Sequence, residues 1–167
     1  MNLKNNNISE TAKSELLSKL MLAWDGQWFL KVVEEFGLEY GLKLNTRVRL
    51  AFARIEMRSL LDVLNKKEAD NFEEAINIIY FYCQEVLNIS SQHEIEVVNH
   101  SATIKVTFCP ILENCRRADL PRYDQACLGC SQIWQEWLKI LLPEEKCYVQ
   151  AVKQMGRNDE FCLLYIF

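Results

Sequence analysis

The chain has 167 residues, half of them hydrophobic and a quarter charged, which is typical of one globular domain with a sizeable core. Its formal net charge of −4 argues against nucleic-acid binding, because nucleic-acid-binding proteins present a basic face. No apolar run is long enough to span a bilayer, and the polar start lacks the apolar core of a signal peptide. We therefore expect a single cytoplasmic domain over 1–167, with no nucleic-acid or membrane partner.

The first half of the chain, 9–88, is predicted to be helical. One helix is expected to start at Ser9, and a helical stretch is expected to stop near Gly37. The segment 23–30 between them is predicted as a turn between helices. A further helix is predicted to begin at residue 38 or 45 and to run to about 64. The next one is predicted to begin at Asn71, with Glu74 in the capping-box position.

In the second half, 89–167, the hydrophobic residues first follow the period of two that is typical of strands, then the helical period, and then the period of two again. Alternating runs end and begin around the turn 99–101, so they predict a hairpin. A well-patterned helix follows near 126–141, with Asp124 as its expected N-cap. Two more strands are predicted at about 146–155 and 160–167, joined by a turn at 156–159. The chain is thus predicted to be an α+β protein, with N-terminal helices packed on a β-β-α-β-β antiparallel sheet unit.

The clearest chemical signal is a group of four cysteines in one short stretch of the second half. Four thiolates can close a tetrahedral site on zinc or hold an iron–sulfur cluster. We expect the first to close a strand, the second to lie in the following loop, and the last two to share the apolar face of a helix start. In chain order they are Cys109, Cys115, Cys127 and Cys130.

Three interpretations of this group stay open. The thiols are interpreted as small buried core residues, as ligands of zinc or an iron–sulfur cluster, or as a redox pair at 127–130. Pro110 directly after Cys109 is a feature of ferredoxin-type ligation. We favour zinc, because a structural site suits a small domain without another redox motif.

Two further thiols follow in the predicted C-terminal hairpin. A regular hairpin turning near Asn158 would separate Cys147 and Cys162 by about 20 Å along the strand. The two are therefore not expected to share one metal ion, although either could act as a single ligand. His100 is expected to be an exposed turn residue.

Several other side chains could line a pocket or do chemistry. Trp24 and Trp28 could line a pocket, and Asp25 between them could act as a general base. We favour an interhelical turn in which Trp28 and Phe29 are core anchors. Trp134 and Trp137 on the last predicted helix could be core or pocket wall. The charged residues Arg54, Glu56 and Arg58 could form an exposed helix face or the polar lining of a cavity, and we favour the exposed face.

The order of two strands, a cysteine loop, a helix and two strands resembles the vinyl-4-reductase domain. So does the ending from Met155 through Gly156 and Asp159 to Cys162 and Ile166, although Gly156 and Asp159 stand two residues further apart than in that family. The whole chain, with its segment 24–29 and its helix around 54–56, is also similar to the L-2-amino-thiazoline-4-carboxylic acid hydrolase-like family of uncharacterised proteins.

This resemblance implies an α+β fold with a pocket for a small, often hydrophobic ligand between helices and sheet, and often a homodimer. It also implies a zinc site in a Glu-x-x-Cys arrangement, which the fragment from Glu144 to Cys147 matches, with Cys162 as the following cysteine. The longer spacing here leads us to keep the 109–130 group as the preferred site.

Three functions follow from these observations. The first is a zinc-stiffened domain that binds a small organic molecule or acts as a sensor. The second is a small-molecule hydrolase-like enzyme with Cys127, Cys130 or a metal-bound water as nucleophile, assisted by Asp25 or Glu113. The third is an iron–sulfur redox protein. We favour the first, because no complete acid–base constellation accompanies the cysteines.

Overall fold

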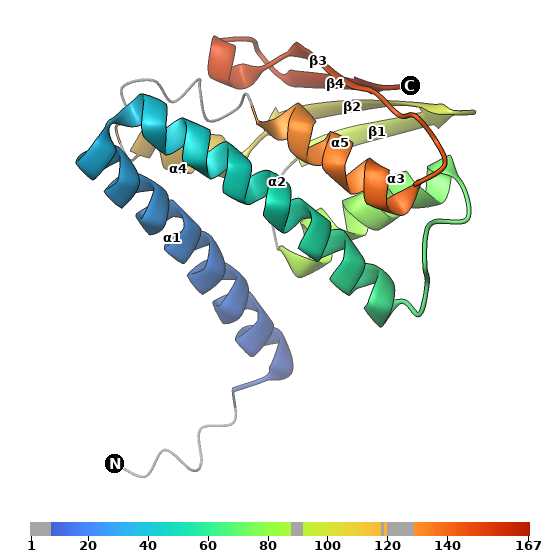
Figure 1. Cartoon of the computed structure of the whole chain (residues 1–167), viewed down its shortest axis with the longest axis horizontal. Helices are drawn as coiled ribbons and strands as arrows, with labels where there is room; N and C mark the ends of the chain where they lie inside the picture. Colours follow the sequence, from blue (N-terminus) through green and yellow to red (C-terminus); the bar gives the residue numbers. More distant parts are fainter. Residues whose placement is uncertain (1–7, 88–91, 118, 120–128) are drawn as a thin grey trace.

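The structure of the protein is a computed structural model that describes residues 8–87, 92–117, 119 and 129–167. Within these residues the chain forms an α+β fold, in which the helices pack on one face of an antiparallel sheet (Figure 1). The predicted fold class is therefore confirmed.

Two long helices, α1 (Glu10–Phe36) and α2 (Leu38–Val63), form an antiparallel hairpin. The Ser9 hydroxyl oxygen accepts a hydrogen bond from the Ala12 amide at 3.1 Å and caps α1 as predicted. Gly37 separates the two helices with a φ of +84°, a conformation that glycine adopts without strain. The predicted turn at 23–30 is wrong, because these residues continue α1 and a lone glycine is tolerated in a helix.

The third helix, α3 (Phe72–Phe81), starts at the predicted cap. The Asn71 side-chain oxygen accepts from the Glu74 amide at 2.9 Å. The helix then widens into one π-helical turn (Tyr82–Val86), closed by a hydrogen bond from the Leu87 amide to the Tyr82 carbonyl at 2.9 Å. Such turns are rare and are often found at functional sites.

The sheet consists of β1 (Gln92–Val98), β2 (Ser101–Phe108), β3 (Val149–Lys153) and β4 (Cys162–Ile166), in the order β1-β2-β4-β3. All neighbouring strands are antiparallel, and both predicted hairpins are present. Asn99 and Asn158 adopt positive φ at the two turns, as asparagine does more readily than most residues.

Two shorter α-helices flank the gap between the hairpins: α4 (Pro110–Arg117) follows β2 after Cys109, and α5 (Cys130–Leu141) precedes β3. A 3-10 helical turn (Met155–Arg157) lies between β3 and β4. The prediction that Cys115 lies in a loop is wrong. Pro110 is favourable as the first helical residue, and the pair Glu113–Arg117 closes an ion pair at 3.2 Å along one face of α4. The expected N-cap Asp124 lies outside the described residues.

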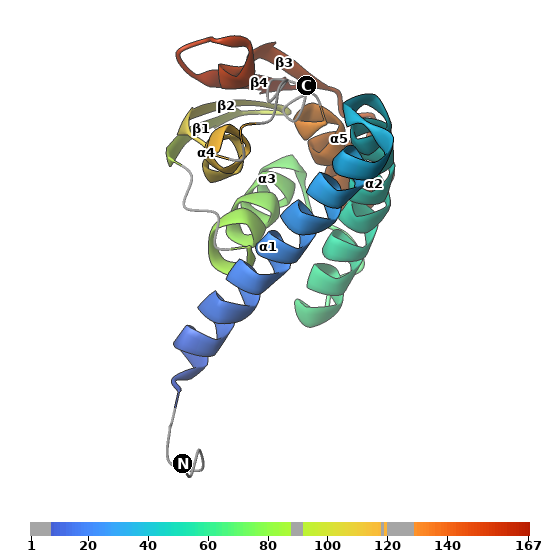
Figure 2. The ribbon, with the colours of Figure 1, turned by 90° about the vertical axis from the view of Figure 1, so that its left-hand side faces the viewer.

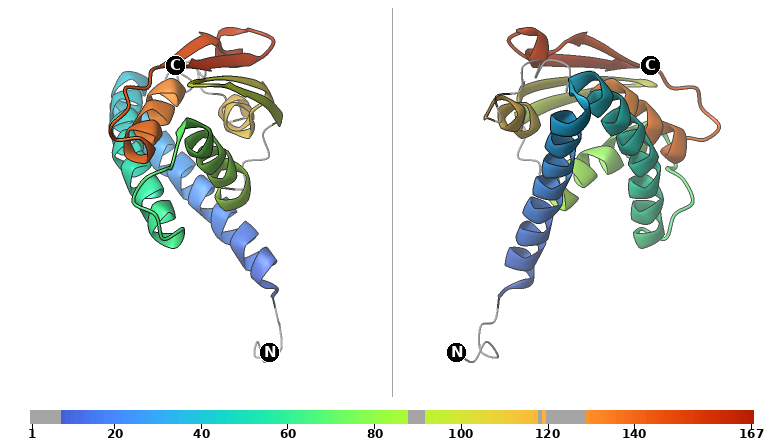
Figure 3. Two further views of the ribbon diagram at one scale, coloured as in Figure 1. Left: turned by 90° about the vertical axis from the view of Figure 1, so that its right-hand side faces the viewer. Right: turned by 60° about the vertical axis from the view of Figure 1, so that its left-hand side comes forward.

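One hydrophobic core joins the helical half of the chain to the sheet. Its members alternate along β2 and β4, where Ile104, Leu164 and Ile166 point toward the helices. The largest fully buried side chains come from every layer: Met57, Phe72, Ile76, Ile79, Ile104, Leu138, Leu141 and Ile166. The helices α1 to α5 lie on this one face, and no described segment covers the other face of the sheet (Figures 2 and 3).

Candidate functional site

The cysteine group predicted from the sequence lies at one end of the sheet. Cys109 stands between the end of β2 and the start of α4, Cys115 lies in α4, and Cys130 is the first residue of α5. Cys127 lies outside the described residues. Among the described residues, no three His, Cys, Asp or Glu side chains form a group that could hold a metal ion.

Cys130 differs from its expected surroundings. The helical spacing predicts that it shares the apolar face of α5, but its side chain is exposed. The buried residues of that face are Trp137, Leu138 and Leu141 in the second half of the helix. Cys130, in the first turn of α5, therefore lies outside the hydrophobic core.

Cys162 is brought to the same end of the sheet by strand pairing. It pairs with Val106 on β2, three residues before Cys109. Burial, and then the nearby Cys109, raise the pKa of the Cys115 thiol. Burial is also the main cause that raises the pKa of Cys162, with a smaller contribution from Cys109, while a hydrogen bond from the Met155 amide at 3.3 Å opposes the shift. Cys109 is thus the thiol that influences both others.

Cys147 lies at the opposite end of the hairpin. Its neighbour Tyr148 exchanges two backbone hydrogen bonds with Phe167, five residues beyond Cys162. At about 3.3 Å per residue this agrees with the separation predicted for the two thiols. Cys147 is buried, and burial raises the pKa of its thiol.

The predicted pocket residues are divided between two helices. Trp24 is 72% exposed on α1, and Asp25 and Trp28 are half-buried on the same helix. Trp137 on α5 is buried, and Trp134 beside it is half-buried, with the two ring centroids 5.8 Å apart. Of the five aromatic and acidic candidates, the pair on α5 lies next to the polar group described below.

The expectation that Glu56 belongs to an exposed charged face is wrong. Arg54 and Arg58 are exposed, but Glu56 lies on the opposite side of α2 with its side chain only 1% exposed. Two residues along a helix correspond to a rotation of about 200°, so three alternate charges cannot share one face. The buried residues Ala53, Met57, Leu60 and Leu61 follow the helical period that includes position 56, which is the signal that could have identified it.

Glu56 is the centre of a buried polar group between α2, the π-helical turn and α5. Its Oε2 atom accepts a hydrogen bond from Trp137 Nε1 at 2.8 Å. Burial, and then the charge and hydrogen bonding of Glu56, raise the pKa of the Tyr82 hydroxyl, which therefore lies beside the same carboxylate. The Tyr82 and Trp137 rings meet edge to face at 5.7 Å.

The second carboxylate oxygen of Glu56 is not satisfied. Oε1 is buried and has no hydrogen-bond partner among the described residues. The nearest cation is Arg49, whose Nη2 atom stands 3.6 Å away, beyond hydrogen-bonding distance. Asn45 lies about one helical turn before Arg49 and about three turns before Glu56 on α2, and its Oδ1 atom is a second buried oxygen without a partner in the described chain. Buried polar atoms are normally paired, so each such exception calls for an explanation.

The π-helical turn that carries Tyr82 is tied to α1. The buried Ser18 hydroxyl donates to the Val86 carbonyl, the last of that turn, at 3.0 Å. Next to Tyr82, burial raises the pKa of Cys83 to about 12, with Glu56 as the second cause. The Cys83 thiol is therefore protonated at neutral pH, so it is not a nucleophile there.

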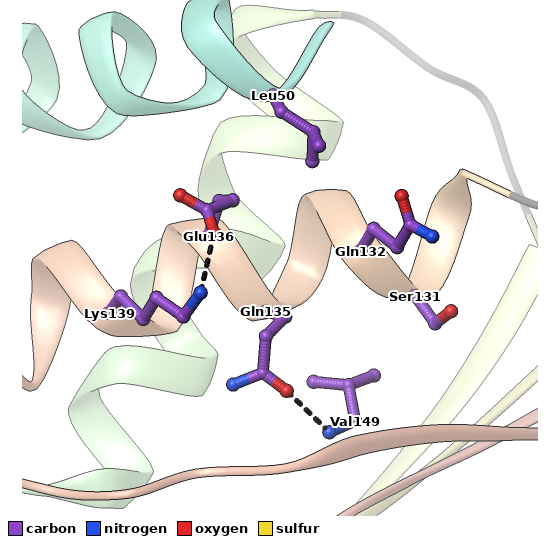
Figure 4. A pocket seen from close by; sticks show the side chains of 7 residues that line it. All are labelled: Leu50, Ser131, Gln132, Gln135, Glu136, Lys139 and Val149. Atoms are coloured by element: carbon purple, nitrogen blue, oxygen red, sulfur yellow. Dashed lines mark hydrogen bonds and ion pairs between the residues drawn. The ribbon is translucent and has the colours of Figure 1, made fainter. Parts of the chain in front are cut away.

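An open hollow of about 310 Å³ lies on the other side of α5, between α2 and β3 (Figure 4). Its central polar side chains are already paired. Gln135 accepts from the Val149 amide at 3.0 Å and donates to the Cys147 carbonyl, and Glu136 binds Arg54 and Lys139 at 2.9 and 2.6 Å. Among the described residues that line this hollow, none carries a buried polar atom without a hydrogen-bond partner, in contrast to Glu56.

The sequence places the chain in a known family. Residues 6–161 match the model of a family described as a family of unknown function, DUF6125. The chain belongs to this family. No curated protein matches the sequence. The similarity to the vinyl-4-reductase domain and to the thiazoline-carboxylate hydrolase-like proteins stays a prediction for this member of the family. Among the described residues, none of the helices is both long and apolar enough to cross a membrane.

Proposed function

We propose that this protein is a non-enzymatic domain of sensor type that binds a small organic molecule at Glu56. One observation carries the proposal: the Oε1 atom of the buried Glu56 carboxylate has no hydrogen-bond partner among the described residues. An unpaired buried acceptor costs a protein about 1–3 kcal/mol, and more when it is charged. A ligand that donates a hydrogen bond to Oε1 would remove this cost.

The surroundings of Glu56 define the chemistry of the ligand. Trp137 and Tyr82 supply aromatic surfaces; Trp137 Nε1 donates to the other carboxylate oxygen, and the Tyr82 hydroxyl lies beside the same carboxylate. Small-molecule sites typically combine such apolar walls with a few orienting polar groups. The ligand is accordingly a small molecule with a flat apolar body and one N–H or O–H donor.

Binding rather than catalysis is favoured at this site. The adjacent thiol, Cys83, is protonated at neutral pH because its pKa is raised to about 12. The carboxylate is held by Trp137 on one oxygen and approached by Arg49 on the other. An arrangement without an activated nucleophile matches a sensor better than a hydrolase.

The proposal can be tested with three ring compounds of similar size that differ in their donors. Benzylamine and benzyl alcohol each carry a donor, whereas toluene has none. We expect the first two to raise the melting temperature of the protein and to change its tryptophan fluorescence, and toluene to do neither. A concentration of ten times Kd stabilises a protein by about 1.4 kcal/mol, which is readily detected as a thermal shift.

The variant Glu56→Gln sharpens this test. The amide keeps one oxygen for Trp137 but presents an NH2 donor where Oε1 was, so a donor-bearing probe meets another donor. We expect the response to both probes to be lost in Glu56→Gln and kept in the control Glu73→Gln, an exposed residue of α3. An equal response to toluene, no response to any probe, or an unchanged response in Glu56→Gln would overturn the proposal.

We propose a second function for the cysteine-bearing end, the binding of zinc by Cys109, Cys115, Cys127 and Cys130, with an iron–sulfur cluster as the alternative. It is supported by the position of Cys109, which influences the pKa of Cys115 and also of Cys162. Thiolate ligands also fit the cytoplasmic location that we propose for the protein, since thiols persist in a reducing compartment.

Metal analysis of anaerobically purified protein tests this second proposal. We expect about one zinc ion per chain, as in a structural site with four thiolate ligands. Cys109→Ser is expected to lose the metal, and Cys147→Ser, at the other end of the hairpin, to keep it. A brown protein that contains iron and sulfide would show that the site holds an iron–sulfur cluster instead of zinc. A metal-free protein that is stably folded would refute both.

A further inference from the structure

The bare face of the sheet, opposite the helices, carries an ordered pattern of charges. We call it the outer face. Its residues alternate with those of the core, and the strand register aligns them in rows across all four strands. One row reads Glu94, Lys105, Leu163, Lys153, and the next reads Glu96, Thr103, Tyr165, Gln150. The acidic residues are on the β1 edge, and a lysine stands on the β3 edge.

The two ends of the first row differ in their partners. Glu94 lies 3.4 Å from Lys105, but its side chain remains 76% exposed. Lys153 Nζ lies over the Phe161 ring, 4.4 Å from its centroid, and Lys105 approaches the same ring from β2. No described carboxylate forms an ion pair with Lys153. The outer face therefore has an acidic edge and a basic edge in the same row.

Apolar side chains are exposed at one end of the outer face. Tyr148 and Phe167 stack at 6.1 Å, and Tyr165 and Val98 lie near them in the register. Tyr148 and Phe167 are both more than half exposed. An antiparallel sheet often leaves one face in water, but such a face is then polar. A sheet face that remains in water is not expected to carry these exposed aromatic side chains.

We propose that the outer face is an interface with a second copy of this chain. In a closed dimer the two copies are related by a two-fold axis and use the same surface. An axis parallel to the strands places β1 over β3 of the second copy and keeps the rows in line, so Glu94 faces Lys153. The same operation places Val98 over Tyr148. An axis across the strands would instead place β1 over β1, where Glu94 and Glu96 would repel their own copies.

The size of the face sets the strength of the dimer. Four strands of five paired residues each cover about 19 Å by 17 Å, an area of about 320 Å². A standard interface buries roughly 800 Å² of each partner, so the outer face is smaller. The association is therefore weak and depends on concentration. It packs two sheets at the small angle that their twist imposes, about −30°.

The test is a charge exchange followed by analytical ultracentrifugation from low micromolar to near-millimolar protein. We expect a monomer–dimer equilibrium for the natural chain. The single variants Glu94→Lys and Lys153→Glu each place like charges opposite one another and are expected to weaken the dimer by at least about tenfold. The double variant, which keeps the net charge, is expected to restore it.

Two controls separate this interface from general effects. Lys19→Glu, an exposed reversal on α1, is expected to leave the equilibrium unchanged. Thermal melting shows whether each variant is folded, and exposed reversals are expected to change it little. A natural chain that stays monomeric at all concentrations overturns the proposal. So does a dimer that ignores both reversals, or a double variant that stays dissociated.

Discussion

Replacement of Glu56 by alanine is expected to destabilise the protein by about 3 kcal/mol, or a fall of about 10 °C in melting temperature. The carboxylate is the acceptor for the buried Trp137 Nε1–H and lies beside the Tyr82 hydroxyl, so its removal leaves two buried donors without a partner. It also removes the counter-charge of Arg49, whose side chain is mostly buried. Urea unfolding followed by tryptophan fluorescence measures the change.

A matched glutamate shows whether this loss is specific. Glu73→Ala, on the exposed side of α3, is expected to change the free energy of unfolding by less than about 0.5 kcal/mol. The variant Trp137→Phe is expected to cost less in the Glu56→Ala background than in the natural chain, because both substitutions remove the same hydrogen bond. Strictly additive losses would show that Glu56 and Trp137 do not interact.

The second large effect concerns two glycines in helices, for which opposite results are expected. A Cβ atom at Gly41 would stand 2.5 Å from Val33 Cγ2 and 3.5 Å from Phe29, two residues of the facing helix α1. Gly41→Ala is therefore expected to destabilise the protein by about 1–2 kcal/mol, because overpacking outweighs the better helix propensity of alanine. Gly26→Ala meets nothing within 4 Å and is expected to stabilise by about 0.5–1 kcal/mol.

A double variant identifies the cause at Gly41. Val33 is β-branched and cannot turn its methyl group away easily, so the clash must be relieved by the helices. Gly41→Ala combined with Val33→Ala is expected to be about 1–2 kcal/mol more stable than the sum of the two single variants. An additive result, or destabilisation by Gly26→Ala, would show that close packing at Gly41 does not hold the hairpin together.

Features encoded by neighbouring residues could be predicted from the sequence. The caps at Ser9 and Asn71, the stop at Gly37 and the hairpin turn around Asn99 are confirmed, because each depends on one residue and its near neighbours. The fold class followed from the change of hydrophobic period from helix to strand. The separation of Cys147 and Cys162 followed from the strand rise alone.

The features that were missed depend on contacts between distant segments. Cys162 lies beside the end of β2 because β4 inserts between β2 and β3, an order that no local pattern indicates. Glu56 was placed among its charged neighbours, although the buried positions on either side of it show which face of α2 it occupies. Its role becomes visible only when Trp137, 81 residues later, is brought against it.

Gln135 gives the exposed edge of the sheet a protection that the fold would otherwise lack. As an edge strand, β3 presents backbone groups that could pair with a strand of any other chain. The Gln135 side chain occupies the Val149 amide and the Cys147 carbonyl at the start of that strand, and the irregularity between Ala151 and Lys153 interrupts its other half. The edge that borders the hollow of Figure 4 is thus a poor template for pairing with a strand of another chain. Two copies can therefore associate through the outer face without also extending the sheet at its edge.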